Sequence, residues 1–119
     1  MEQQNSGFDE EFAVIKKLYV TKLAKQVRNI TIQWQLLQKS STKRELLVDI
    51  YRNVHKISGS AGIFGCGTVG SIATDVEQQL KPIVDNDMAL SHHDDGTISR
   101  QFESLMQEVE ALMVLMEKS

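Results

Sequence analysis

The sequence predicts an all-α protein that folds as an antiparallel up-and-down four-helix bundle. Four stretches carry apolar residues three or four positions apart, which is the spacing of one helix face. No stretch alternates apolar and polar residues between turn signals, as a strand would. The 119 residues include only seven glycines and one proline. Four long amphipathic helices with short connections pack most simply as such a bundle, so we expect one domain over residues 1–119.

The first helix is expected to begin near Phe8, because residues 1–7 are polar and predict a frayed, flexible tail. No glycine or proline interrupts the stretch that follows. Since a helix of this length is unusual in a globular domain, we allow for a break near residues 16–20 and a short extra N-terminal helix. The stripe comprises Phe8, Phe12, Ile15, Tyr19, Leu23, Val27, Ile30, Trp34 and Leu37.

The second helix has start and stop signals. Residues 42–45 read Thr-Lys-Arg-Glu, a capping box in which Thr42 and Glu45 satisfy each other's backbone N–H groups. Gly65 and Gly67 are expected to end the helix. The apolar stripe between these signals consists of Leu46, Leu47, Ile50, Val54, Ile57 and Ala61.

For each of the last two helices the sequence offers two candidate N-cap residues. Gly67 or Thr68 is expected to cap the third helix, which should end or kink near residues 80–81 because Pro82 lacks an N–H. Residues 85–96 are rich in turn formers and predict a loop. Asp95 or Thr97 should then cap the last helix. Its stripe is Ile98, Phe102, Leu105, Val109, Leu112 and Met116.

Composition and charge exclude several classes of protein. The formal net charge of −3 argues against a nucleic-acid-binding protein, which would usually be basic. No apolar run is long enough to span a membrane, and no signal-peptide pattern opens the chain. The lone Cys66 cannot form an internal disulfide and suits a reducing compartment. We therefore expect a cytoplasmic monomer.

The second helix carries the residues with the clearest chemical interest, around His55. This histidine follows Val54 directly, so it lies about 100° away from the apolar stripe, near the water boundary. Glycine in a helix interior costs about 1 kcal/mol relative to alanine, so two glycines on its face indicate that another molecule approaches the backbone there. The residues that share its face are Tyr51, Arg52, Ser58, Gly59 and Gly62.

Residues 55–65, His-Lys-Ile-Ser-Gly-Ser-Ala-Gly-Ile-Phe-Gly, resemble the signature of histidine phosphotransfer (HPt) domains. That signature has a histidine, an aliphatic residue two positions on, then Gly, two small residues, a bulky apolar residue and Gly. Every fixed position matches. Many members carry lysine three residues after the histidine, where this chain has Ser58. The resemblance in pattern extends over about residues 8–117.

The resemblance implies a four-helix bundle that relays a phosphoryl group between receiver-domain aspartates in two-component signalling. His55 would accept the group on Nε2, which suits imidazole because its unperturbed pKa of about 6.5 leaves it nucleophilic near neutral pH. The chain would be a phosphocarrier and not an ATP-dependent kinase. Its partners would be response-regulator receiver domains and a hybrid sensor histidine kinase. It would need no cofactor, and Mg²⁺ would be held by the receiver.

Three neighbours of His55 are candidates to contact the phosphoryl group. Arg52 shares the histidine face and is the first choice for a cation, although it could equally be a solvated surface residue. Lys56 is displaced by about 100° and is expected to touch a partner. Ser58 could donate to the phosphoryl oxygens or bond to its own backbone. Tyr51, Gly59 and Gly62 are expected to contact the docked partner.

Other functions compete less well with this interpretation. A non-catalytic HPt-like adaptor that docks a receiver or kinase without phosphotransfer is the main alternative. The dimerisation module of a histidine kinase is disfavoured, because it uses two helices per chain. The run His92–Asp95 resembles a metal cluster, but consecutive loop residues point apart, so no metal site is expected. There is no phosphate-binding loop for a nucleotide.

Overall fold

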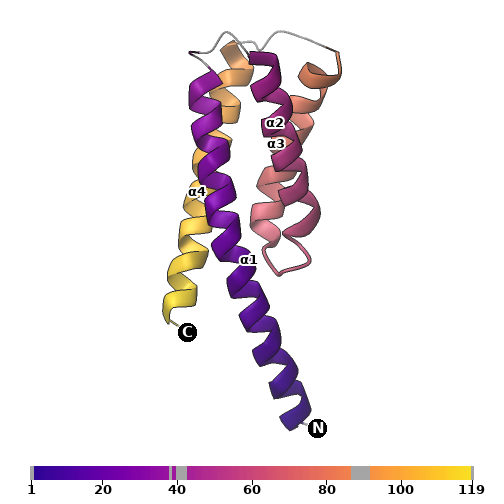
Figure 1. Ribbon diagram of the computed structural model, residues 1–119, viewed down its shortest axis with the longest axis vertical. Coiled ribbons are helices and arrows are strands. Elements are labelled where there is room, and N and C mark those ends of the chain that lie inside the picture. Colours follow the sequence, from indigo (N-terminus) through magenta and orange to yellow (C-terminus); the bar gives the residue numbers. More distant parts are fainter. Residues whose placement is uncertain (1, 38, 40–42, 87–91, 119) are drawn as a thin grey trace.

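The computed structural model describes residues 2–37, 39, 43–86 and 92–118. Side chains are described from residue 9 onward and, after the gap at residues 87–91, from residue 94 onward. It contains four α-helices, and the described residues include no strand. The predicted all-α class is therefore confirmed (Figure 1). The helices are α1 (Glu2–Leu37), α2 (Lys43–Ser60), α3 (Gly67–Asp85) and α4 (His92–Lys118).

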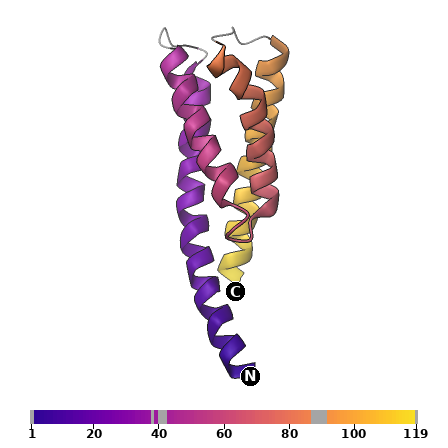
Figure 2. The same cartoon turned by 90° about the vertical axis from the view of Figure 1, so that its right-hand side faces the viewer.

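The helices form an antiparallel bundle in chain order. α1 packs against α2 and α4, and α3 packs against the same two helices, whereas the diagonal pairs do not touch within the described parts of the chain. Successive helices run in opposite directions (Figures 1 and 2). α2 and α3 therefore lie side by side as a helical hairpin, and this hairpin carries the candidate site.

The core is a column of aliphatic and aromatic side chains contributed by all four helices. Its largest fully buried members include Leu23, Ile57, Leu80 and Phe102. Nearly all of the stripes that the sequence predicts lie in this core. Ile15 does not, because its side chain is 49% exposed on the solvent face of α1. The apolar stripe predicted for the first helix therefore enters the core only from Tyr19 onward.

α1 is one continuous helix, so the break expected near residues 16–20 is wrong. The physical reason is local, because no residue between Phe8 and Leu37 is a glycine or proline that would interrupt the backbone hydrogen bonds. No separate N-terminal helix forms. α1 begins at Glu2, within the segment for which the sequence predicted a frayed tail.

The junction between α2 and α3 differs from the expectation in detail. α2 ends at Ser60, and Gly65 takes a left-handed backbone conformation with φ of 74°, which glycine adopts without strain. The N–H of Cys66 then donates to the carbonyl of Ala61 at 2.8 Å, closing the turn. α3 begins at Gly67 with Cys66 as its N-cap residue, so neither Gly67 nor Thr68 caps it.

α3 continues through Pro82, whereas the sequence predicted an end or kink near residues 80–81. The helix runs on for three more residues. Arg44, at the start of α2, donates hydrogen bonds to the carbonyls of Ile83 and Val84. These bonds satisfy carbonyl groups in the last turn, where a helix lacks backbone partners of its own.

α4 begins at His92, ahead of Asp95 and Thr97, which were expected to cap it. Residues 92–96, predicted as loop, are therefore helical. Asp94 and Asp95 lie in the first turn, where carboxylates interact favourably with the helix dipole. The capping box at Thr42 and the loop at residues 87–91 lie outside the described residues.

None of the four helices, over the residues described, combines the length and apolar character that a membrane span needs.

Candidate functional site

The end of α2 is held against α1 by an aromatic contact and a hydrogen bond. The rings of Tyr19 and Phe64 stack with centroids 4.2 Å apart. The Ser60 hydroxyl donates to the carbonyl of Lys56, so its lone pairs accept the Tyr19 hydroxyl, 2.7 Å away. Burial raises the pKa of Tyr19, and the bond to Ser60 lowers it by less, so the phenol stays neutral at physiological pH. These contacts fix the turn that follows the His55 helix.

His55 projects from α2 into solvent. Its side chain is 68% exposed, whereas its neighbours Val54 and Ile57 are buried in the core. The two buried residues fix the rotation of the helix, and the imidazole is held outward as a consequence. A phosphoryl acceptor must be reachable from outside, and His55 meets that condition.

Glu77 on α3 holds one nitrogen of the imidazole. The His55 Nδ1 atom lies 2.9 Å from Glu77 Oε2, and the Glu77 side chain is only 19% exposed. An ionised carboxylate can only accept hydrogen bonds, so Nδ1 carries the proton and donates it. The neutral ring then has its lone pair on Nε2, which is the nitrogen directed away from α3.

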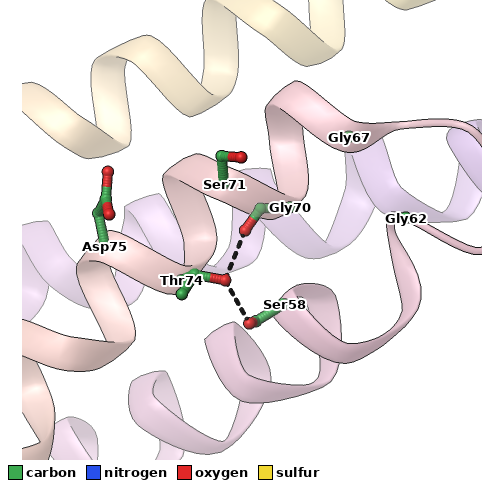
Figure 3. A pocket seen from close by; sticks show the side chains of 7 residues that line it. All are labelled: Ser58, Gly62, Gly67, Gly70, Ser71, Thr74 and Asp75. Carbon is green, nitrogen blue, oxygen red and sulfur yellow. Dashed lines mark hydrogen bonds between the residues drawn. The ribbon is translucent and has the colours of Figure 1, made fainter.

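A second pair of side chains links the two helices one turn further along. Ser58 Oγ lies 2.7 Å from Thr74 Oγ1, and Thr74 Oγ1 donates to the carbonyl oxygen of Gly70 at 2.8 Å. Thr74 has one hydroxyl proton and uses it on Gly70, so Ser58 must be the donor to Thr74. The sequence analysis left two alternatives open for Ser58, a contact with the phosphoryl group or a hydrogen bond to its own backbone. The structure gives it a partner on α3 (Figure 3).

Glu77 and Thr74 were missed by the sequence analysis, although the sequence contains a signal for both. Neighbouring helices of a hairpin place residues opposite each other when they are equally far from the turn. His55 and Glu77 each lie eleven positions from Cys66, and Ser58 and Thr74 each lie eight positions from it. Reflecting α2 onto α3 about Cys66 would have identified both partners.

The glycines beside His55 leave open space, as the sequence predicted. A Cβ atom built on Gly59 or Gly62 would meet nothing within 4 Å. Gly59 lies in α2, but Gly62 lies in the turn after Ser60 and not in the helix. On the other side, the half-buried Tyr51 ring lies 6.3 Å from the imidazole centroid. The open space agrees with the helix-face argument, and contact of Tyr51, Gly59 and Gly62 with a docked partner stays a prediction.

The two cations expected near His55 are both exposed on α2. Arg52 lies one turn before the histidine and Lys56 directly after it. Neither forms an ion pair or side-chain hydrogen bond with another residue in the described ranges. Both side chains are therefore available to an added phosphoryl group or to a partner.

A shallow recess of about 330 Å³ lies between α2 and the first turns of α3. Its lining contains small hydroxyl side chains and glycines, so no bulky residue obstructs the surface one turn beyond His55 (Figure 3). The lining residues are Ser58, Gly62, Gly67, Gly70, Ser71, Thr74 and Asp75.

The site contains no evident ligand set for a metal ion. Within the part of the chain that the structure describes, no three His, Cys, Asp or Glu residues are grouped so that they could hold one. The side chains of His92 and His93 lie outside that part. Cys66 is buried, and burial raises the pKa of its thiol, which keeps it protonated and unreactive.

Comparison with known proteins gives a match to a family. No curated protein and no solved structure was found to match this chain. The family model described as "Hpt domain" matches residues 14–112, which include all four helices in part or in full and the whole of the His55 site. The chain therefore belongs to the Hpt domain family.

Proposed function

We propose that this protein is a phosphocarrier that relays a phosphoryl group between receiver-domain aspartates through His55. Hpt domains are phosphorelay proteins that interact with receiver domains and kinases, and they are phosphocarriers and not kinases themselves. The observation that supports the proposal most directly is the state of the imidazole. Its Nδ1 atom is bound by Glu77, while the side chain is 68% exposed, so Nε2 is left for an incoming group.

The transfer step uses the two nitrogens differently. Nε2 attacks the phosphorus of a receiver aspartyl phosphate in line, the new N–P bond forms, and the P–O bond to the aspartate breaks, releasing a carboxylate. No proton needs to leave Nε2, because Nδ1 already carries it. The ring becomes positively charged as the bond forms. The Glu77 carboxylate offsets that charge at 2.9 Å, and the reverse step returns the neutral ring.

The other elements of the relay would come from the partner. A receiver domain would supply the aspartate and the Mg²⁺, and a hybrid sensor histidine kinase would supply the phosphoryl group. Arg52 and Lys56 are the nearest cations and would screen the added charge of the phosphohistidine. Ser58 could contact a phosphoryl oxygen only by leaving Thr74. We place the relay in the cytoplasm, which suits the reduced Cys66.

The docking face would be the exposed surface of α2 around His55 together with the adjoining surface of one neighbouring helix, α3. Gly59 and Gly62 let a partner's backbone approach, and Ile63 in the following turn is the most exposed large apolar residue described. A relay has to release its partner after each transfer. We therefore expect a transient interface that buries less than about 1,200 Å² in total.

The test of this function is transfer from a phosphorylated receiver. The protein should acquire phosphate that is labile in acid and stable in base, as expected for a phosphohistidine, and peptide mapping should locate it on His55. If a receiver binds but no phosphate is transferred from any receiver tested, the non-catalytic adaptor is the better interpretation. Phosphate on a serine or aspartate of this chain would also contradict the proposal.

The Glu77→Gln variant tests the positioning role of the carboxylate. Glutamine can still accept from Nδ1, but it carries no negative charge to offset the developing charge on the ring. A charge-assisted hydrogen bond is about twice as strong as a neutral one, which predicts about a fivefold slower phosphorylation of His55 by phosphoramidate. Glu77→Leu, which removes the acceptor, should be slower still and should lose the preference for the Nδ1–H tautomer, as read from ¹⁵N NMR shifts of the imidazole.

Asp75→Asn is the matched control for that experiment. It removes one carboxylate from the same helix, but Asp75 is exposed and makes no contact with the imidazole among those observed. Its rate and tautomer should equal those of the parent. If Asp75→Asn and Glu77→Gln slow the reaction equally, the effect is one of net charge, and Glu77 has no positioning role.

A further inference from the structure

α1 carries an unusual distribution of charge. Between Phe12 and Leu37 it has five basic residues and no acidic residue, whereas the rest of the chain has eight basic and sixteen acidic residues. Lys22, Lys25 and Arg28 follow one another at steps of three, and like charges at such spacing destabilise a helix. None of these three forms an ion pair with a residue that the structure describes. The repulsion is therefore not relieved within the described molecule.

The solvent face of α1 also carries large apolar side chains in a regular order. Four of them are between 47% and 68% exposed, and they are Ile15, Leu18, Ile32 and Leu36. These four residues and three polar residues between them lie on one line along the helix, which we call the outer seam. Its seven members alternate at steps of three and four, which is the spacing of a coiled-coil contact line. In order, the outer seam is Ile15, Leu18, Lys22, Lys25, Asn29, Ile32 and Leu36.

The opposite face of α1 already has its own contact line. Val20, Leu23, Val27, Ile30, Trp34 and Leu37 follow the same three-and-four spacing and are buried in the bundle. Single apolar residues scattered over a surface are normal. Here two exposed aliphatic pairs lie on the same line of one helix, which is a regular arrangement. α1 therefore has one face for the bundle and a second face built for a further helix.

We infer that the outer seam of α1 is a docking surface for an amphipathic helix of a partner protein that carries acidic residues at its centre and aliphatic residues toward both ends. The aliphatic ends would pack on Ile15 and Leu18 and on Ile32 and Leu36. The acidic centre would pair with Lys22 and Lys25 and relieve their mutual repulsion. This partner would contact a surface distinct from the phosphotransfer site, because the outer seam lies on the face of α1 turned away from the bundle, whereas His55 projects from α2 beside α3.

Two other occupants fit the outer seam less well. A second copy of α1 would place lysines against lysines in a parallel pair, and Lys22 against Lys25 in an antiparallel pair that aligns Ile15 with Ile32. A membrane surface favours a continuous apolar face with cations along its edges. Here Lys22 and Lys25 lie within the line itself, between the two apolar pairs, and are exposed as the apolar residues are.

Two synthetic helical peptides test the inference. Both have leucine at the outer contact positions, and they differ only in carrying glutamate or lysine at the two central positions. By fluorescence anisotropy at low salt, the protein should bind the glutamate peptide at least about tenfold more tightly than the lysine peptide. The Lys22→Glu/Lys25→Glu variant should reverse that preference. Leu18→Ser/Ile32→Ser should weaken binding of the glutamate peptide.

The matched control is Lys81→Glu/Lys118→Glu, which changes the net charge equally at exposed positions on α3 and α4 and should keep the parent's preference. Phosphotransfer from a receiver should be unchanged in Lys22→Glu/Lys25→Glu. The inference is overturned if the two peptides bind equally or not at all, or if that variant loses receiver transfer. Binding to phosphatidylserine vesicles without a preference between the peptides would instead identify a membrane surface.

Discussion

His55→Gln should reduce phosphate uptake below detection, both from a phosphorylated receiver and from phosphoramidate. Glutamine has no nucleophilic nitrogen, but its amide can still donate to Glu77, so the contact between α2 and α3 is retained. The free energy of unfolding should change by no more than about 0.5 kcal/mol, because the imidazole is mostly exposed. Chemical denaturation and a phosphate assay on the same preparation measure both quantities.

His92→Gln and His93→Gln are the natural controls, because they remove the other two histidines of the chain. Each should retain full phosphorylation. If the His55→Gln protein remains folded and still takes up acid-labile phosphate, the acceptor is one of these two residues and the assignment of His55 is wrong.

Gly59→Trp should slow transfer from a receiver by about a hundredfold while leaving the protein at least as stable as the parent. The added side chain meets nothing within the molecule, since a Cβ at this position has open space around it. Replacing glycine within a helix also improves helix propensity. The indole would, however, occupy the surface where the partner's backbone must approach. A displacement of about 1 Å between reacting groups is enough for a loss of this size.

Three comparisons isolate the steric effect. Phosphoramidate is small and needs no docking, so its reaction with the Gly59→Trp protein should be slowed much less. Gly59→Ala gains at least as much helix propensity without the bulk and should transfer at nearly the parent rate. Ala111→Trp adds an indole to an exposed position on α4, which does not contact α2, and should have no effect. Equal receiver transfer by the parent and Gly59→Trp would refute the docking role of this face.

The sequence predicted the fold class and the exposed part of the site because both depend on periodicity along one helix. The positions of His55, Arg52 and Gly59 follow from their angle to the buried stripe of α2. The error at Pro82 arose because a tertiary contact decides the outcome. Arg44 from α2 supports the last turn of α3 beyond Pro82, and no local signal around the proline reports this contact.

Glu77 and Thr74 lie between these two cases. Their own helix gives no reason to single them out, since Glu77 looks like an ordinary surface carboxylate. Their importance comes from the antiparallel pairing of α2 and α3 about Cys66, which requires the turn to be located correctly. The sequence placed the end of the second helix at Gly65–Gly67, whereas α2 ends at Ser60. Even so, that estimate was close enough for the reflection to have worked.

The hairpin of α2 and α3 affects when the hydrogen bonds of the His55 site form during folding. The four side chains that hydrogen-bond between α2 and α3 beside His55 lie within residues 55–77, a segment of 23 residues closed by one turn. Short loops close quickly and at low entropic cost, so contacts of this kind are favoured early in folding. The imidazole can therefore acquire its tautomer as soon as this hairpin docks, independently of the long-range closure of the bundle by α1 and α4.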